Sequence, residues 1–278
     1  MPAKPKLGQN FLIDHGAAER IAAALGDVAG RTVIEIGPGR GAMTGALAAR
    51  AGRVLAIELD AEFAADLRRR FSAERVTVVE RDVLRFDFAA AQARAGAKLR
   101  VAGNLPYYIT SPILLKLAAS HAALDLAVLM AQREVADRVT SQPGSRDYGL
   151  LSVTVQMHGP VEPLFTLPPT AFSPAPQVHS TVFRWRFAPR FGELGIAAPA
   201  GFLRFARHGF AHKRKTLANN LRAAGFAPHA VAAALAGAGV DAQARAEALP
   251  LETLASLWRS VETAENSQLN GAEEGGRR

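Results

Sequence analysis

The stretch TVIEIGPGRG, residues 32–41, decides the fold, because a short β-branched run is followed at once by glycines at positions 37, 39 and 41. Such a run predicts a buried strand over Thr32–Ile36. The glycines allow a tight turn and a close approach of the backbone to a ligand. The residues that follow, up to about Arg50, have a helical pattern. Strand, glycine turn and helix together predict that N–H groups at the helix N-terminus face an anionic or polar ligand.

The same alternation of strands and helices extends on both sides of this stretch. A helix is predicted over 15–25, with Asp14 as its N-cap. Each strand is apolar on both faces, which is typical of a parallel sheet covered by helices on both sides. The sequence therefore predicts a doubly wound, Rossmann-like α/β domain. Its other strands are predicted over 53–58, 75–80, 99–102 and 124–130, and its other helices over 61–71 and 111–120.

The pattern changes after Arg133. Helices are predicted over 134–140 and 148–158, and a proline-rich, aromatic segment follows over 161–177. Residues 178–187 then alternate between apolar and polar side chains, which predicts an exposed or edge strand.

A boundary between two domains is predicted at 188–199, where prolines and glycines accumulate. The chain beyond it is helical in pattern and rich in alanine, and its last residues are polar. We therefore expect a first domain over 1–188, a small all-helical C-terminal domain over 189–265 and a frayed tail over 266–278.

The composition of the 278 residues is that of a globular protein with a sizeable core, with 49% hydrophobic and 21% charged residues. A net charge of +8 favours nucleic acid or another anionic partner. There is no cysteine, which excludes disulfides and thiolate metal sites. The first ten residues have no apolar core of a secretory signal, and no apolar run approaches the ~18 residues of a membrane span. We expect a cytoplasmic protein with no membrane partner.

Acidic or amide side chains follow three of the predicted strands. Glu58, Asp82 and Asn104 fall at strand ends, on the edge of the sheet that Gly37 also reaches, and open α/β sheets bind ligands at this edge. An acid at the position of Glu58 can hold both hydroxyls of a ribose, and Asp82 can accept a hydrogen bond from the amine of an adenine. The spacing of the three glycines matches neither the dinucleotide fingerprint nor a phosphate-binding loop.

The stretch VAGNLPYY, residues 101–108, adds a second binding element. Pro106 keeps Leu105 extended, so that the Asn104 side chain and the Leu105 carbonyl can face a cleft beside the flat ring of Tyr107. Two acceptors next to an aromatic ring suit a planar ligand with an exocyclic NH2 group, such as adenine. Two tyrosines of an ordinary core would be the alternative interpretation of this short motif.

Taken with the strand-end acids, these residues resemble the S-adenosylmethionine-dependent methyltransferases, and NLPY places them with the adenine N6 enzymes. The resemblance narrows to the dimethyladenosine transferases of small-subunit ribosomal RNA and covers about residues 6–258. It rests on five motifs in the family's order, namely LGQNFL (7–12), EIGPG (35–39), NLPY (104–107), FSPAP (172–176) and KTLANNL (215–221).

This resemblance implies dimethylation of two adjacent adenines in a loop near the 3′ end of 16S rRNA, within a small-subunit assembly intermediate. Asn104 and the Leu105 carbonyl would position the target amine, and Tyr107 and Phe172 would stack on the flipped base. S-adenosylmethionine would be held by residues of the N-terminal segment, the glycine turn and three further strand ends, namely Asn10, Leu12, Gly37, Gly39, Glu58, Asp82 and Asn104. His179 and Ala218 depart from the family pattern, in which an aspartate and a basic residue are common.

A basic stretch over 201–222 contains no acidic residue, which favours a phosphate-binding surface over a solvated helix face. His208 and His212 are spaced four residues apart, but no third ligand is near in sequence, so no metal site is predicted. The cations expected to bind RNA are Arg204, Arg207, Lys213, Arg214, Lys215 and Arg222.

Three other functions remain open at this point. The nearest is an adenine N6 methyltransferase of large-subunit rRNA, against which the order of the motifs and the Lys215-Thr216-Leu217 stretch weigh. A nicotinamide-dependent dehydrogenase is disfavoured by the glycine spacing and by NLPY. A non-catalytic ribosome-assembly factor is compatible with catalysis in the same protein.

Overall fold

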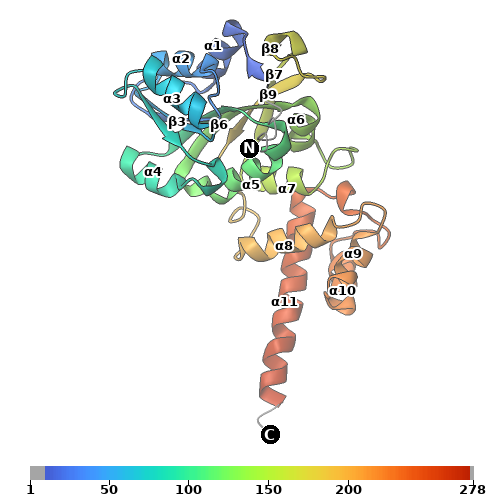
Figure 1. Ribbon diagram of the computed structural model, residues 1–278. Helices are drawn as coiled ribbons and strands as arrows, with labels where there is room; N and C mark the ends of the chain where they lie inside the picture. The colour runs from blue at the N-terminus through green and yellow to red at the C-terminus, as the bar shows by residue number, and fades with distance from the viewer. Residues whose placement is uncertain (1–9, 276–278) are drawn as a thin grey trace, which may run out of the picture. The chain divides into compact units, whose positions relative to one another are not determined.

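The computed structural model describes residues 10–275, and its side chains are described up to residue 264. Two compact units are present (Figure 1). The first contains the chain up to Thr140 together with 158–188, and the second contains 141–157 together with the chain from Pro189. The prediction of a single boundary at 188 is therefore incomplete, because the chain also enters and leaves the second unit before it. Residues 141–157, which include helix α7 (Leu150–Met157), pack with the second unit.

The first unit is built on a seven-stranded sheet with the order β4-β3-β2-β5-β6-β9-β7. The five strands from β4 to β6 are parallel, whereas β9 runs antiparallel to both of its neighbours. In Figure 1, helices α1, α2 and α3 lie on one side of the sheet and α4 and α5 on the other. The strands are β2 (Thr32–Ile36), β3 (Arg53–Glu58), β4 (Val76–Glu80), β5 (Leu99–Asn104), β6 (Leu124–Gln132), β7 (Val161–Leu167) and β9 (Ser180–Arg186).

Aspartates begin three of the helices in this unit. Asp14 caps α1 (His15–Ala24), as predicted, and Asp60 and Asp87 cap α3 and α4 by accepting hydrogen bonds from backbone N–H groups of the first turn. These caps start each helix close to the end of the preceding strand or turn. The helices are α2 (Ala42–Arg50), α3 (Ala61–Arg70), α4 (Phe88–Ala95), α5 (Thr110–Ala119) and α6 (Arg133–Thr140).

One prediction for the far side of the sheet is wrong. Strand β9 is not an edge strand, because it lies between β6 and β7 and most of its residues are buried. The edge is formed by β7, in the segment interpreted as proline-rich and aromatic, where the register shifts between Pro163 and Phe165. Proline is tolerated at such an edge because it lacks only a hydrogen bond that no further strand would accept. Helix α4 was not predicted either.

The N-terminal end of the described chain forms a small sheet of its own. Strand β1 (Phe11–Leu12) pairs antiparallel with β8 (Phe172–Ser173), so that Leu12 lies opposite Phe172. Residues 7–9 of the LGQNFL motif lie outside the described residues. This pairing connects the start of the chain to the FSPAP motif.

The second unit is helical. Its core includes Tyr148 of the 141–157 segment, Phe202, Phe205 and Trp258. Helix α11 covers ten of the residues expected to fray, because no proline or glycine interrupts it before Gly271. In the part of the chain that the structure describes, no helix has both the length and the apolar character needed to cross a membrane. The helices are α8 (Pro199–Gly209), α9 (Leu217–Ala223), α10 (Pro228–Gly237) and α11 (Leu251–Gly275).

Candidate active site

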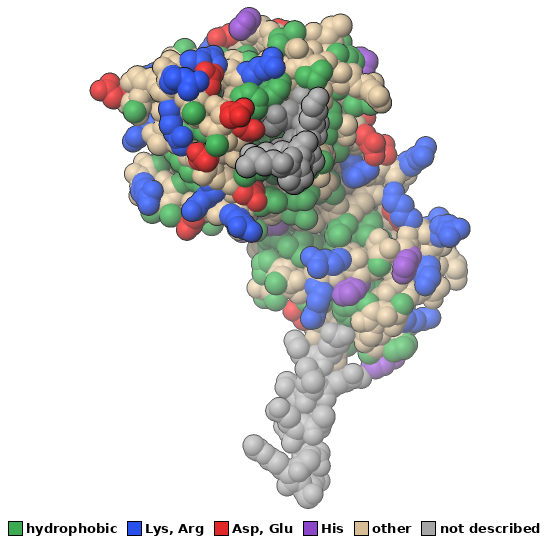
Figure 2. Space-filling model, in the orientation of Figure 1, with side chains coloured by type: hydrophobic (Ala, Val, Ile, Leu, Met, Phe, Trp, Pro, Cys, Tyr) green, Lys and Arg blue, Asp and Glu red, His purple; other side chains and the backbone are tan. Residues whose placement is uncertain are grey.

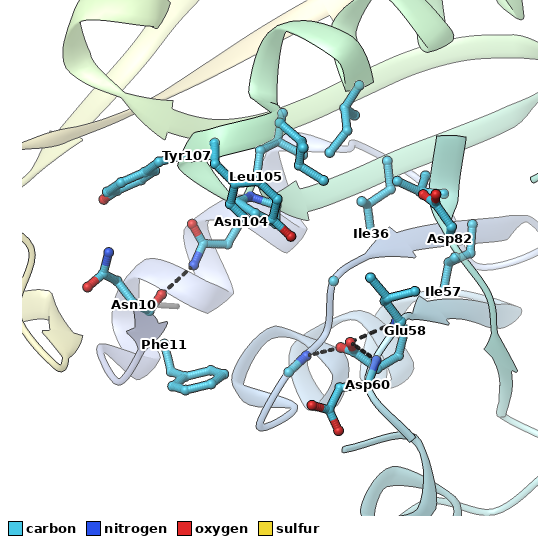
Figure 3. Close-up of a pocket in the computed structure, with 18 of the residues that line it drawn as sticks. Asn10, Phe11, Ile36, Ile57, Glu58, Asp60, Asp82, Asn104, Leu105 and Tyr107 are labelled. Carbon is cyan, nitrogen blue, oxygen red and sulfur yellow. Dashed lines mark hydrogen bonds between the residues drawn. The ribbon is translucent and has the colours of Figure 1, made fainter. Parts of the chain in front are cut away.

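A cavity of about 360 Å³ opens at the carboxyl ends of β2, β3, β4 and β5 (Figure 3). Six of the seven residues predicted to hold the cofactor line it, and so do Leu105 and Tyr107. Residues far apart in sequence thus meet at one edge of the sheet, where parallel strands end together. The predicted cofactor residues that line the cavity are Asn10, Gly37, Gly39, Glu58, Asp82 and Asn104.

The glycine turn after β2 needs its glycines for two physical reasons. Gly37 and Gly39 have φ angles of 64° and 52°, in the left-handed region that glycine adopts without a steric penalty. A Cβ atom on Gly39 would also lie 2.8 Å from the Phe11 ring. The turn is therefore packed directly under the N-terminal segment, whose Phe11 side chain forms one wall of the cavity.

Glu58 ties this turn to the end of β3. Its carboxylate is buried and accepts hydrogen bonds from the backbone N–H groups of Gly39 (2.9 Å), Leu59 (2.8 Å) and Asp60 (2.9 Å), as Figure 3 shows. A carboxylate offers about four acceptor positions. Three donors leave about one for a ligand, so the carboxylate is held in a fixed orientation toward the cavity.

Asp82 contributes a second carboxylate at the end of β4. One of its oxygens accepts a hydrogen bond from the Leu84 N–H at 2.9 Å, which fixes the side chain at the start of a short 3-10 turn. The apolar side chains of Ile36, Ile57 and Val83 line the same cavity. Apolar walls with one carboxylate at the edge suit a flat base that presents an amine.

Asn104 sits opposite, at the end of β5. Its side-chain NH2 group donates to the Asn10 carbonyl at 3.0 Å, which commits the amide nitrogen and leaves the oxygen as the acceptor for a ligand (Figure 3). The Leu105 N–H donates to the Met130 carbonyl at 2.9 Å, and this bond fixes the backbone of the NLPY stretch. The Tyr107 hydroxyl lies 2.9 Å from the Ser180 hydroxyl, so its ring is held at the cavity wall.

Two predicted site residues do not line the cavity. Leu12 and Phe172 are 6% and 3% exposed, and both belong to one buried apolar cluster. Residues in a two-residue strand alternate in direction, so Phe11 faces the cavity and Leu12 the core. Neither side chain reaches the cavity in this structure, and the predicted contacts of Leu12 with the cofactor and of Phe172 with the target base stay predictions.

Sequence reasoning also missed part of the cavity wall. Phe11, Leu59 and Tyr108 line it, and Leu59 and Tyr108 are about half exposed at 54% and 53%. Each is next in sequence to a residue that was predicted to bind. A large apolar residue directly after a strand-end acid is the signal that could have identified Leu59.

Glu35 is a buried carboxylic acid beneath this site. It is 0% exposed, and neither carboxyl oxygen has a hydrogen-bond partner among the described residues. Its neighbours in the adjacent strands are Ala56 and Ala102, whose small side chains leave room for it. Burial is the main cause that raises the pKa of Glu35 from its ordinary value of 4.5 to about 8.

Glu35→Gln should change how stability depends on pH. The unfolded chain releases the Glu35 proton near pH 4.5, whereas the folded chain retains it until about pH 8. The native wild-type protein therefore loses stability relative to the variant as the pH rises between these values, by about 1.4 kcal/mol per unit. Urea unfolding of both proteins at pH 5 and pH 7 should show the difference shifting by roughly 2–3 kcal/mol. A difference that does not vary with pH would mean that Glu35 ionises normally in the folded protein.

The basic stretch of the second unit is exposed. All six predicted RNA-binding cations lie at the surface, and none forms an ion pair with a carboxylate among residues 10–264. Figure 2 shows lysine and arginine side chains over the visible face of this unit. Ala218, in contrast, is buried in the helical core, so a basic residue at this position would not simply add a surface contact.

His208 and His212 do not share a helix face, because α8 ends at Gly209. The His208 ring packs against Phe226, with 6.1 Å between the ring centroids. Within the described residues, no group of three or more His, Asp or Glu side chains could hold a metal ion.

Comparisons with known proteins consistently find ribosomal RNA methyltransferases. The family model described as ribosomal RNA adenine dimethylase matches residues 2–262. The chain is 60% identical over 260 residues to the ribosomal RNA small subunit methyltransferase A of Acidobacterium capsulatum, covering 93% of this chain and 91% of that protein. It is 48% identical to the protein of the same name from Koribacter versatilis, with 93% and 94% covered.

Two solved structures are similar over most of the chain. The 23S rRNA methyltransferase ErmE is 26% identical, with a TM-score of 0.68, 91% of this chain covered and 100% of the other. A dimethyladenosine transferase from Plasmodium falciparum is 21% identical, with a TM-score of 0.72 and 89% and 95% covered, and this likeness concerns the fold.

Proposed function

The chain belongs to the ribosomal RNA adenine dimethylase family, and from this premise we infer that it methylates N6 of two adjacent adenines in a loop near the 3′ end of 16S rRNA. The observation that carries this function is that the NLPY stretch (residues 104–107) lines the same cavity as Gly37, Glu58 and Asp82. The 60% identity to a small-subunit enzyme, against 26% to a large-subunit one, supports the small-subunit substrate.

S-adenosylmethionine fits the cavity as the methyl donor and would supply an activated methyl group on a sulfonium. Glu58 is positioned to accept from a ribose hydroxyl through its remaining acceptor position, and Asp82 from the adenine amine, between the apolar side chains that line this end. Asn10, Phe11 and the glycine turn would enclose the methionine end. The polar groups of the lining are mainly carboxylates and backbone groups, which suit a ligand with ribose hydroxyls, an exocyclic amine and a positively charged sulfonium.

The chain's own contribution to the reaction is position and hydrogen bonding. The lone pair of an adenine amine is delocalised into the ring, so the amine is a weak nucleophile. The Asn104 oxygen and the Leu105 carbonyl are placed to accept from its two N–H bonds, which draws the nitrogen toward tetrahedral geometry. Such aligned acceptors act most strongly as the transition state forms. The amine proton is then released to solvent.

S-adenosylmethionine should bind tightly and NAD weakly, and Glu58→Ala should lower the affinity for S-adenosylmethionine by about 10- to 100-fold. The variant loses charge-assisted hydrogen bonds worth roughly 1–3 kcal/mol, and the N–H groups of Gly39 in the glycine turn and of Leu59 and Asp60 after β3 lose their acceptor. Calorimetry with both ligands measures this. Tighter binding of NAD would contradict the methyltransferase function, and an unchanged affinity in the variant would remove Glu58 from the site.

The helical unit is proposed to bind rRNA through its exposed cations. Neutralising Lys213, Arg214 and Lys215 together should weaken binding to every RNA sequence alike. The slope of log affinity against log salt should fall by about 0.7–0.9 for each phosphate that the protein no longer neutralises. Binding of S-adenosylmethionine serves as the control and should not change. An unchanged salt slope would show that the basic stretch is only a solvated surface.

The function itself is tested in cells that carry the gene, where we place the enzyme in the cytoplasm on a small-subunit assembly intermediate. Mass mapping of 16S and 23S rRNA with and without the gene should show two N6,N6-dimethyladenosines that depend on it, both in 16S rRNA. Loss of a methylated adenine from 23S rRNA instead would favour the large-subunit alternative. Unaltered rRNA would favour a non-catalytic assembly factor.

A further inference from the structure

A second cavity in the first unit is as large as the first. It also measures about 360 Å³ and lies between helix α4 and the face of β3 and β4. Leu55 and Val79 of the two strands are partly exposed on its floor, beside the buried ring of Phe86. On the helix side the lining is Ala90, Ala91 and Ala95. Short alanine side chains do not fill the space between helix and sheet, so an apolar groove remains.

Arginines surround this apolar groove. Arg53, Arg81 and Arg94 line it and are exposed, and no ion pair joins any of them to a carboxylate among residues 10–264. The guanidinium of Arg53 donates to the Thr77 hydroxyl at 2.8 Å, which holds it at the entrance. The acidic residue in the lining, Asp87, already caps α4 through the Ala90 N–H. The groove is therefore apolar inside and positive at its rim.

Arg81 connects this groove to the cavity of the proposed active site. It lines both, and it directly precedes Asp82. An RNA whose target adenine enters the first cavity can therefore reach the groove along the same sheet edge, with Arg81 between the two. Charge and continuity both favour the substrate over an unrelated ligand.

We propose that the groove between α4 and the β3–β4 face is a second rRNA-binding site, which takes an unpaired nucleotide segment of the substrate. Bases would pack on Leu55 and Val79 beside the buried Phe86, and the flanking phosphates would lie on the three arginines. This division between an apolar surface for bases and cations for the backbone is how single-stranded nucleic acids are held without sequence preference. The proposal rests on the proposed function, because it assumes an rRNA substrate.

The first test uses the full chain and a 16S rRNA transcript. Arg53→Gln with Arg94→Gln should weaken binding, by about tenfold for each arginine, as expected for a lost charge-assisted hydrogen bond. The salt slope should fall by about 0.7 for each arginine that neutralises a phosphate. Lys98→Gln is the matched control, since Lys98 is exposed close to Arg94 in sequence but outside the groove lining. Single-turnover methylation at saturating RNA should keep its wild-type rate in all variants.

A second variant tests the apolar part without changing any charge. Ala91→Leu fills the groove from the exposed side of α4. A 16S transcript containing 4-thiouridine should crosslink to the tryptic peptide 86–94 in the wild type, and this crosslink should be lost in the Ala91→Leu protein. Circular dichroism and binding of S-adenosylmethionine report that each variant is folded.

Three results would overturn the proposal. The groove arginines and Lys98 could give equal losses, which would mean a general charge effect. No crosslink could appear at 86–94 in the wild type. The variants could bind protein-free rRNA normally and fail only on an assembled small-subunit particle, which would assign the groove to a protein segment. Binding and crosslinking do not require methyl transfer, so absence of methylation by the wild type would contradict the proposed function and leave these measurements intact.

Discussion

Phe172→Ala should lower the free energy of unfolding by about 3–5 kcal/mol, the range found when a buried phenylalanine is truncated. Its ring is 3% exposed in a cluster that includes Leu12, Leu167 and Ala171. The same residue pairs β8 with β1, which leads to Asn10 and Phe11 at the cavity. Urea unfolding measures the loss, and a stability equal to that of the wild type would contradict the packing role.

Phe172→Leu separates packing from the stacking role that the family resemblance implies. Leucine retains most of the apolar volume and should cost less than the alanine variant, but it offers no aromatic face to a base. A 2-aminopurine at the target position of the RNA reports base flipping. Normal flipping with Phe172→Leu would leave the residue a packing role alone. Loss of flipping in a stable variant would show that the ring reaches the base when RNA is bound.

The centre of the sheet could be predicted from the sequence because its signals are local. Strand β2 occupies the predicted residues Thr32–Ile36, and β3 the predicted 53–58. Strands that are apolar on both faces belong inside a parallel sheet, and their ends must then meet on one edge. The positions of Glu58, Asp82 and Asn104 in one cavity follow from this rule alone.

What could not be predicted depends on partners distant in sequence. The order β6-β9-β7 requires antiparallel pairing of strands whose alternation is equally compatible with an edge. The composition of residues 141–157 does not show that they belong to the second unit, because their apolar side chains would suit either core. In the two-residue strands, the face that Leu12 and Phe172 present is set by the β1–β8 register and not by either motif.

Asn104→Ala should slow methyl transfer by 100- to 1,000-fold when RNA and S-adenosylmethionine are both saturating. Removing one aligned polar partner from a transition state costs about 2.7–4 kcal/mol. Single-turnover rates at saturating RNA and S-adenosylmethionine measure the chemical step, and 2-aminopurine should show the base still flipped. Tyr107→Ala should instead lower the fraction of flipped base, because a stacking surface worth about 1–3 kcal/mol is removed. Tyr107→Phe lacks the hydroxyl that meets Ser180 but keeps the ring, and it should flip the base normally.

Asn104 has a second bond whose loss must be separated from the loss of the acceptor. Its NH2 group donates to the Asn10 carbonyl, so alanine also releases the N-terminal segment from β5. Asn104→Asp lacks the same donor but retains an oxygen acceptor at the same position. If the acceptor drives the reaction, the aspartate variant should transfer methyl groups faster than the alanine variant, even though its carboxylate also repels the Asn10 carbonyl and weakens the contact with residue 10 further. Equal rates in the two variants would assign the effect to closure of the N-terminal segment. A wild-type rate in Asn104→Ala would show that the Asn104 side chain of the NLPY stretch does not position the amine of the target adenine.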